Sequence, residues 1–199
     1  MTSYTITNAA CALFAGGLLS SCAFTEQRMP ITMSHANVVA VLDTIDQIEV
    51  DAGELGTHKA ASQNVRSFAS RLALEHTRST QARHHLAERM DVEPQKSQLA
   101  LALEQMYEES KNLLGKKSGR DFDEAYIQTQ IMVHEQMMKL VQDTEESMDD
   151  PDLRQHLRYT CPALLSHLSA ARVAAVQLAI TPTTGIDAYR RDYLHCGFG

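Results

Sequence analysis

The sequence predicts an all-α protein, a four-helix bundle with an extra helix in the long connection between the second and third helices of the bundle. The main observation is that apolar residues recur every three or four positions over most of the chain after residue 33, which is the period of an amphipathic helix. No segment shows the alternation of apolar and polar residues that is typical of a strand.

The first two helices of the bundle are predicted over residues 34–59 and 64–90. Each carries one apolar stripe, and the short polar break between them is typical of antiparallel neighbours. Gly53 and Gly56 lie inside the first of these helices. Since a glycine lowers helix propensity, we interpret both glycines as positions where another helix comes close.

The long second connection contains the extra helix, which is predicted over residues 97–114 and is followed by a basic turn over residues 115–119. The third helix of the bundle is predicted to begin at Asp121. Asp121 and Glu124 have the spacing of a capping box, in which each side chain caps the backbone at the other residue.

The fourth helix is predicted over residues 151–179, with Asp150 as its N-cap and Pro151 as its first residue. The helices together make one bundle domain over residues 34–179. Residues 180–199 are polar and aromatic without clear periodicity, and we interpret them as a loose or docked C-terminal tail.

Composition excludes several classes of protein. Lysine and arginine number 18 against 25 aspartate and glutamate, and the formal net charge of −7 argues against nucleic-acid binding. Beyond the N-terminus, no apolar run approaches the ~18 residues of a membrane-spanning helix. A chain of 199 residues is long enough for one domain with a sizeable core.

Residues 1–21 are predicted to be a lipoprotein signal peptide. They contain no charged side chain, although such signals usually begin with Lys or Arg, and residues 9–19 form a short apolar core. The motif Leu19-Ser20-Ser21-Cys22 follows, and it matches the site where signal peptidase cuts before a cysteine that receives lipid. The alternative is that residues 1–21 form a buried N-terminal helix.

A lipid on Cys22 would anchor the chain at a membrane surface, with residues 22–33 as a tether and the bundle facing the periplasm. Ala23 rather than Asp follows the cysteine, which by analogy with enteric bacteria favours the outer membrane of the bacterial cell envelope. Cys161 and Cys196 are then the remaining thiols. Two thiols pair readily in an oxidising compartment, but the sequence does not place these two near each other.

Each helix of the bundle carries one polar residue on its apolar stripe. Neighbours three, four or seven positions away are apolar, so these polar side chains project inward. The four residues are Glu49, His76, His134 and His167, in helix order. All four lie near the midpoints of their helices, and antiparallel packing of helices of similar length would bring them together in the core.

One glutamate and three histidines form a suitable ligand set for zinc, iron or copper, and bundle cores are where such sites are built. Glu75 and Glu135 each adjoin a core histidine and are candidates for extra ligands or for partners that orient the histidines. The alternative is a metal-free buried polar network in which Glu49 pairs with protonated histidines.

Four segments, in their order and spacing, resemble a known family. They are Glu49-Val50 with Gly53 and Leu55; Val65-Arg66-Ser67-Phe68-Ala69 running to Glu75-His76; Phe122-Asp123-Glu124-Ala125-Tyr126-Ile127 with His134; and Pro162-Ala163-Leu164-Leu165-Ser166-His167-Leu168. Over about residues 34–178 the chain resembles domain of unknown function 4142, a bacterial envelope family often labelled outer membrane protein. The resemblance implies a ferritin-like fold. Two positions depart from it: Glu75 stands where the family usually has Asp, and Cys161 where it usually has Leu.

The paired Glu-x-x-His motifs of ferritins and di-iron oxidases do not occur in this sequence, since Glu54 and His58 are one residue too far apart. Ferroxidase or di-iron oxygenase chemistry is therefore not expected. Two functions remain: a lipid-anchored bundle that binds a transition metal for storage, buffering, sensing or redox chemistry, or a non-enzymatic envelope stress or interaction scaffold without metal. An oxidase or hydrolase would also need an open coordination position and a base such as Glu75 or Glu135.

Overall fold

The computed structural model describes residues 33–180, and within this range it consists of five helices and no strand. The helices are α1 (His35–Lys59), α2 (Gln63–Arg89), α3 (Gln98–Gly115), α4 (Gly119–Ser147) and α5 (Pro151–Gln177). The all-helical class and the five predicted helices are confirmed. The predicted signal peptide, Cys22, nearly all of the tether and the C-terminal tail lie outside the described range.

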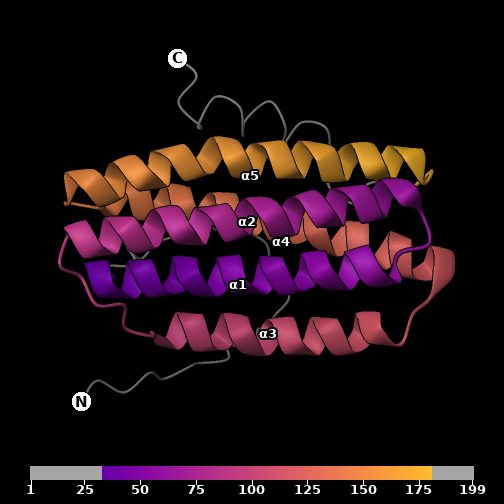
Figure 1. The fold of residues 1–199 in the computed structure, drawn as a ribbon, viewed down its shortest axis with the longest axis horizontal. Coiled ribbons are helices and arrows are strands. Elements are labelled where there is room, and N and C mark those ends of the chain that lie inside the picture. Colours follow the sequence, from indigo (N-terminus) through magenta and orange to yellow (C-terminus); the bar gives the residue numbers. More distant parts are fainter. Residues whose placement is uncertain (1–32, 181–199) are drawn as a thin grey trace, which may run out of the picture.

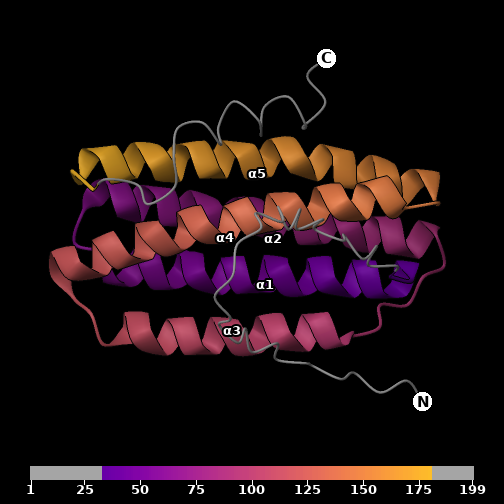
Figure 2. The same ribbon diagram turned by 180° about the vertical axis from the view of Figure 1, so that it is seen from behind.

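All five helices lie side by side along the long axis of the molecule (Figure 1). The packing is most extensive between α1 and α2 and between α4 and α5, so the bundle consists of two closely packed helix pairs. The extra helix α3 lies along the outer side of α1, which both views show (Figure 2). No helix within residues 33–180 has the length and the apolar character needed to cross a lipid bilayer.

The N-terminal end of α5 agrees with the sequence prediction, whereas the N-terminal end of α4 differs from it. Asp150 caps α5 as predicted, because its side chain accepts hydrogen bonds from the backbone N–H groups of Asp152 and Leu153. The capping box at Asp121 is wrong, because α4 begins at Gly119. The Glu124 carboxylate instead accepts a hydrogen bond from Arg120, one turn earlier on the helix, at 2.5 Å.

The two glycines of α1 are positions of close approach, as the sequence predicts. A Cβ atom added at Gly53 would lie 2.7 Å from the carbonyl oxygen of Ala69 on α2. A Cβ atom added at Gly56 would lie 2.6 Å from the ring of Tyr126 on α4. Only residues without a side chain allow α1 to sit this close to both neighbours.

Cys161, on α5, is buried and disulfide-bonded. The sequence leaves open whether Cys161 pairs with Cys196. Cys196 lies outside the described residues.

Candidate metal centre

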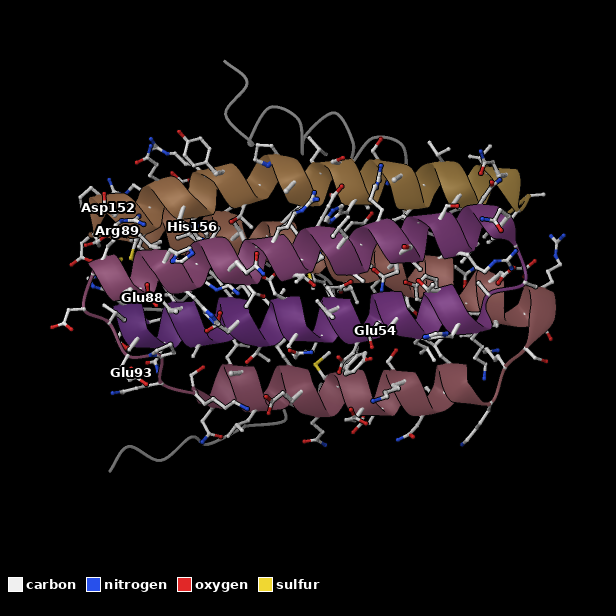
Figure 3. All side chains as sticks on the ribbon, in the orientation of Figure 1. Glu54, Glu88, Arg89, Glu93, Asp152 and His156 are labelled. Atoms are coloured by element: carbon white, nitrogen blue, oxygen red, sulfur yellow. The ribbon has the colours of Figure 1, made fainter. Side chains whose placement is uncertain are left out.

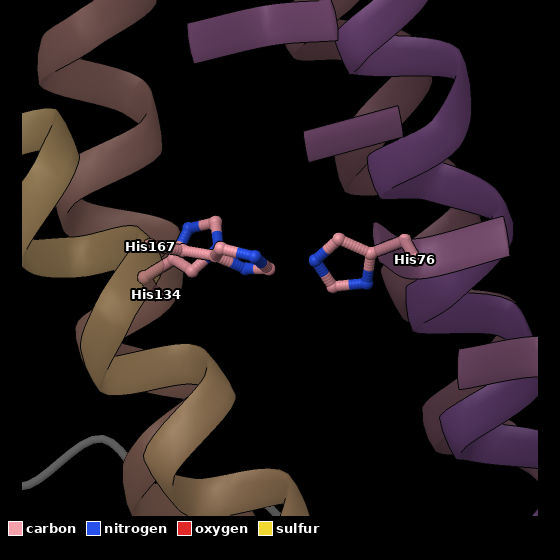
Figure 4. A group of neighbouring side chains, drawn as sticks. All are labelled: His76, His134 and His167. Carbon is pink, nitrogen blue, oxygen red and sulfur yellow. The ribbon is translucent and has the colours of Figure 1, made fainter. Parts of the chain in front are cut away.

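Three of the four predicted core residues come together at the centre of the bundle. His76 on α2, His134 on α4 and His167 on α5 are 4%, 0% and 2% exposed. One ring nitrogen from each lies within 4.8 Å of the other two. The rings project from their helices toward one another, with His76 facing His134 and His167 (Figure 4). The inward direction that helical periodicity predicts for these three side chains is confirmed.

One nitrogen of each imidazole is held by a hydrogen bond to an oxygen atom. The bonds run from His76 Nδ1 to Asp46 Oδ1 (2.7 Å), from His134 Nδ1 to the carbonyl oxygen of Gln130 (2.9 Å) and from His167 Nε2 to Glu75 Oε2 (2.5 Å). Because a carbonyl or carboxylate oxygen accepts, each ring donates its N–H there, and in its neutral form each ring carries a lone pair on its other nitrogen.

The other nitrogen of each ring is buried and has no hydrogen-bond partner among residues 33–180. These atoms are His76 Nε2, His134 Nε2 and His167 Nδ1. An acceptor thus orients each of the three imidazoles at one nitrogen, and the described residues leave the other nitrogen without a partner. This is the arrangement in which histidine ligates a metal ion, with the second nitrogen held by a protein acceptor.

The electrostatic surroundings keep two of the rings neutral at pH 7. Burial, together with the positive charge that His167 and His76 can carry, lowers the pKa of His134 well below its usual value. Burial and His76 lower the pKa of His167 to about 4, against the opposing effect of the hydrogen bond to Glu75. A neutral imidazole is the form that binds a metal ion.

Glu49, the predicted fourth ligand, is buried on α1 but does not belong to the group of three. Its carboxyl group forms a hydrogen bond with the Gln130 side chain, and its Oε2 atom has no hydrogen-bond partner in the described part of the chain. Burial, and to a smaller extent the negative charge of Asp46, raises the pKa of Glu49 to about 7, although His76 and Gln130 act in the opposite direction. The structure therefore brings together three histidines and places the glutamate beside them.

The sequence prediction missed Asp46 and Arg83, which are both buried. Asp46 accepts from His76 through Oδ1 and pairs through Oδ2 with Arg83 Nη1 at 2.8 Å. Burial alone would raise the pKa of the Asp46 carboxyl, but the hydrogen bond from His76 and the charge of Arg83 hold it below its usual value. A signal was present, because Asp46 precedes Glu49 by three residues and Arg83 follows His76 by seven.

The two glutamates that adjoin core histidines in the sequence have different surroundings. Glu75 does not bond to its sequence neighbour His76 but reaches across to His167 on α5. A residue adjacent to an inward-facing position points about 100° away around the helix, which here is toward the next helix. Glu135 forms an ion pair with Arg172 at 2.7 Å.

Comparison with known proteins identifies a family. The model of the family described as Domain of unknown function (DUF4142) matches residues 21–173. No curated protein and no solved structure matches the chain. The ferritin-like character that the resemblance implies for the bundle therefore stays a prediction.

Proposed function

The chain belongs to the DUF4142 family, and we propose that its bundle binds a divalent transition metal ion through His76, His134 and His167. One observation carries this proposal. Three buried imidazoles bring ring nitrogens within 4.8 Å of one another, and each ring has one nitrogen held by a hydrogen bond and one without a partner within residues 33–180.

The electrostatics favour a metal ion over the metal-free polar network. That network requires protonated histidines paired with Glu49, whereas the pKa values of His134 and His167 are lowered. The neutral rings of His134 and His167 each offer a buried acceptor that meets no donor within residues 33–180, and an unsatisfied buried polar group costs about 1–3 kcal/mol. A metal ion at this position would give all three of the buried ring nitrogens a partner at once.

The ligand set indicates zinc, iron or copper, since imidazole suits all three. Zinc holds nitrogen ligands at about 2.0–2.1 Å, which places two ligands of one tetrahedral ion about 3.4 Å apart. Small inward movements of the rings would satisfy that geometry. Three protein ligands leave a coordination position open, as in catalytic zinc sites, whereas four would close the site. Glu49 stays a candidate fourth ligand in the proposal.

The location of the protein is part of the proposal and is supported by the sequence alone. Residues 1–21 and Cys22 have the character of a bacterial lipoprotein signal and its lipidation site. We propose a lipid-anchored, periplasm-facing protein of the outer membrane. Metabolic labelling with a fatty acid should mark the wild-type chain and should fail to mark Cys22→Ser.

Elemental analysis tests the metal centre directly. The protein, purified without chelator or metal-affinity resin, is expected to carry about one equivalent of a single transition metal. His134→Ala and His167→Ala should each lose it while keeping the helical circular dichroism spectrum. His84→Ala is the matched control, because His84 is an exposed histidine of α2, and it should retain the metal.

Two results would contradict the proposal. Full metal content in both His134→Ala and His167→Ala would show that the ion binds elsewhere. No metal in the wild type, even after reloading with zinc, copper and iron, would reduce the three histidines to a buried polar network. The remaining function would then be an envelope stress or interaction scaffold.

A further inference from the structure

A cavity of about 400 Å³ lies between α2 and α5 and reaches the three-histidine group. His76, His167 and Asp46 form part of its lining. It lies between the two helix pairs, where packing is less extensive than within each pair. His156, which also lines the cavity, lies where α5 faces α2 (Figure 3). The metal centre is therefore adjacent to a space large enough for a small organic molecule.

Most of the inner wall of this cavity is apolar. These apolar side chains come from α1, α4 and α5, and they are Leu42, Ile45, Met137, Val141 and Leu164. A pocket with apolar walls and a few convergent polar groups is the usual form of a small-molecule site. The walls favour a ligand with a hydrocarbon body over a fully hydrated ion.

Arg83 supplies a donor that no residue in the described part of the chain uses. The side chain is 1% exposed and lines the cavity. Its Nε atom pairs with Asp43 and its Nη1 atom with Asp46, but its Nη2 atom has no hydrogen-bond partner within residues 33–180. A guanidinium is always charged and presents its donors in a fixed plane that matches a carboxylate. The Asp46 carboxylate contacts both residues, His76 through Oδ1 and Arg83 through Oδ2.

We infer that this cavity binds a small aliphatic monocarboxylate. One carboxylate oxygen would take the open coordination position of the metal ion, the other would accept from Arg83 Nη2, and the hydrocarbon chain would lie along the apolar wall. This inference rests on the metal centre proposed above in the form with three histidine ligands and without Glu49, since only that form leaves a coordination position open. It adds the class of ligand and the route by which the ligand reaches the ion.

A cobalt-loaded protein provides a readout that does not depend on any activity. Co²⁺ replaces zinc in imidazole sites, and its visible absorption changes when an oxygen ligand joins the ion. Titration of the full chain with acetate and with pentanoate should give saturable spectral changes. Each buried methylene tightens binding up to about fourfold, so pentanoate is expected to bind at least tenfold more tightly than acetate.

Two variants narrow the mouth of the cavity without touching the metal ligands. Ala82 on α2 and Ala163 on α5 are exposed and line the cavity from opposite sides. Ala82→Trp and Ala163→Trp should keep bound Co²⁺ and should lose at least tenfold in pentanoate affinity. Ala102→Trp is the matched control, because Ala102 is an exposed alanine on α3, and its affinity should equal that of the wild type. Arg83→Lys keeps the positive charge but removes the planar set of guanidinium donors. This variant should lower the affinities for acetate and for pentanoate by about the same factor.

The outcomes separate this inference from the proposed metal centre. A chain that takes up no Co²⁺ at the histidines would overturn both. Stoichiometric Co²⁺ without a spectral response to either carboxylate would overturn the inference and leave the metal centre in place. Equal affinity for acetate and pentanoate, or unchanged pentanoate affinity in both tryptophan variants, would also overturn it, because the carboxylate would then bind outside the cavity.

Discussion

At the scale of single residues, each histidine of the group depends on an acceptor that holds its N–H. For two of them the acceptor is a carboxylate, Asp46 for His76 and Glu75 for His167. A carboxylate at this position fixes the orientation of the ring and increases the basicity of the ligating nitrogen. The carboxylates of α1 and α2 are therefore expected to influence metal affinity without binding the ion.

Asp46→Asn and Glu75→Gln are expected to lower metal affinity by about 10–100-fold each, because the amide accepts a weaker hydrogen bond and carries no charge. Competition with a chromophoric chelator measures the change. Glu54→Gln, at an exposed position of α1, is the control and should bind as the wild type does. Unchanged affinity in both test variants would mean that the carboxylates do not orient the rings.

The buried Glu49 affects the pH dependence of stability. Its pKa is raised from 4.5 to about 7 in the folded state, so the stabilisation it contributes is complete below pH 4.5 and is lost as the pH rises through about 7. His167 acts in the opposite sense. Its pKa is lowered from 6.5 to about 4, and its contribution is present above pH 6.5 and is lost as the pH falls through about 4.

In the metal-free protein the two effects partly cancel between pH 7 and pH 5. Glu49→Gln removes the part that increases on acidification. Its free energy of unfolding should therefore fall more steeply from pH 7 to pH 5 than that of the wild type. Urea denaturation at both pH values measures the difference. An identical change in the two proteins would show that Glu49 does not titrate in this window.

At the scale of the helices, α1 is fitted to its neighbours by the absence of side chains at Gly53 and Gly56. Gly56→Ala would place a Cβ atom 2.6 Å from the Tyr126 ring and 2.7 Å from Ala69 Cβ. Overpacking of this kind lowers the free energy of unfolding by about 1–3 kcal/mol. The higher helix propensity of alanine raises it by about 1 kcal/mol. We expect a net loss of stability on urea denaturation.

Gly115→Ala is the matched control for this prediction. Gly115 ends α3, and a Cβ atom added there meets no atom within 4 Å. This variant should be as stable as the wild type or slightly more stable. If Gly56→Ala were as stable as Gly115→Ala, the close approach of α1 to α4 would have to relax without cost.

At the scale of the whole molecule, the three histidines connect helices that otherwise pack less extensively. His76 belongs to the α1–α2 pair, whereas His134 and His167 belong to the α4–α5 pair. A metal ion held by all three links the two pairs across the centre of the bundle. Because the proposed ion would bind the folded state, its binding free energy would add to the stability of the fold.

Zinc in excess is therefore expected to raise the thermal midpoint of the wild-type protein. The stabilisation amounts to about 2.7 kcal/mol when free zinc is about 100 times its Kd. Differential scanning calorimetry with zinc and with a chelator measures the shift. His134→Ala should show no shift between the two conditions, and a shift of equal size in this variant would place the stabilising ion elsewhere.

The sequence by itself determined the features that depend on position along one helix. Helical periodicity predicted all five helices and the inward direction of His76, His134 and His167, because apolar spacing defines which face of a helix is buried. The occurrence of two glycines inside a helix, where glycine lowers helix propensity, also predicted the close approach at Gly53 and Gly56. The start of α4 was predicted two residues late, since the helix begins at Gly119 with Ser118 as its N-cap, and Glu124 pairs with Arg120.

The tertiary structure decided everything that depends on how the helices are rotated and shifted relative to one another. Periodicity within one helix does not contain those rotations, so it could not separate Glu49 from the three histidines that meet. It also could not show that Glu75 reaches His167 on another helix, or that Asp46 connects His76 to Arg83. The cavity between α2 and α5 depends on the spacing of the two helix pairs, which is set only when all the side chains between them are packed.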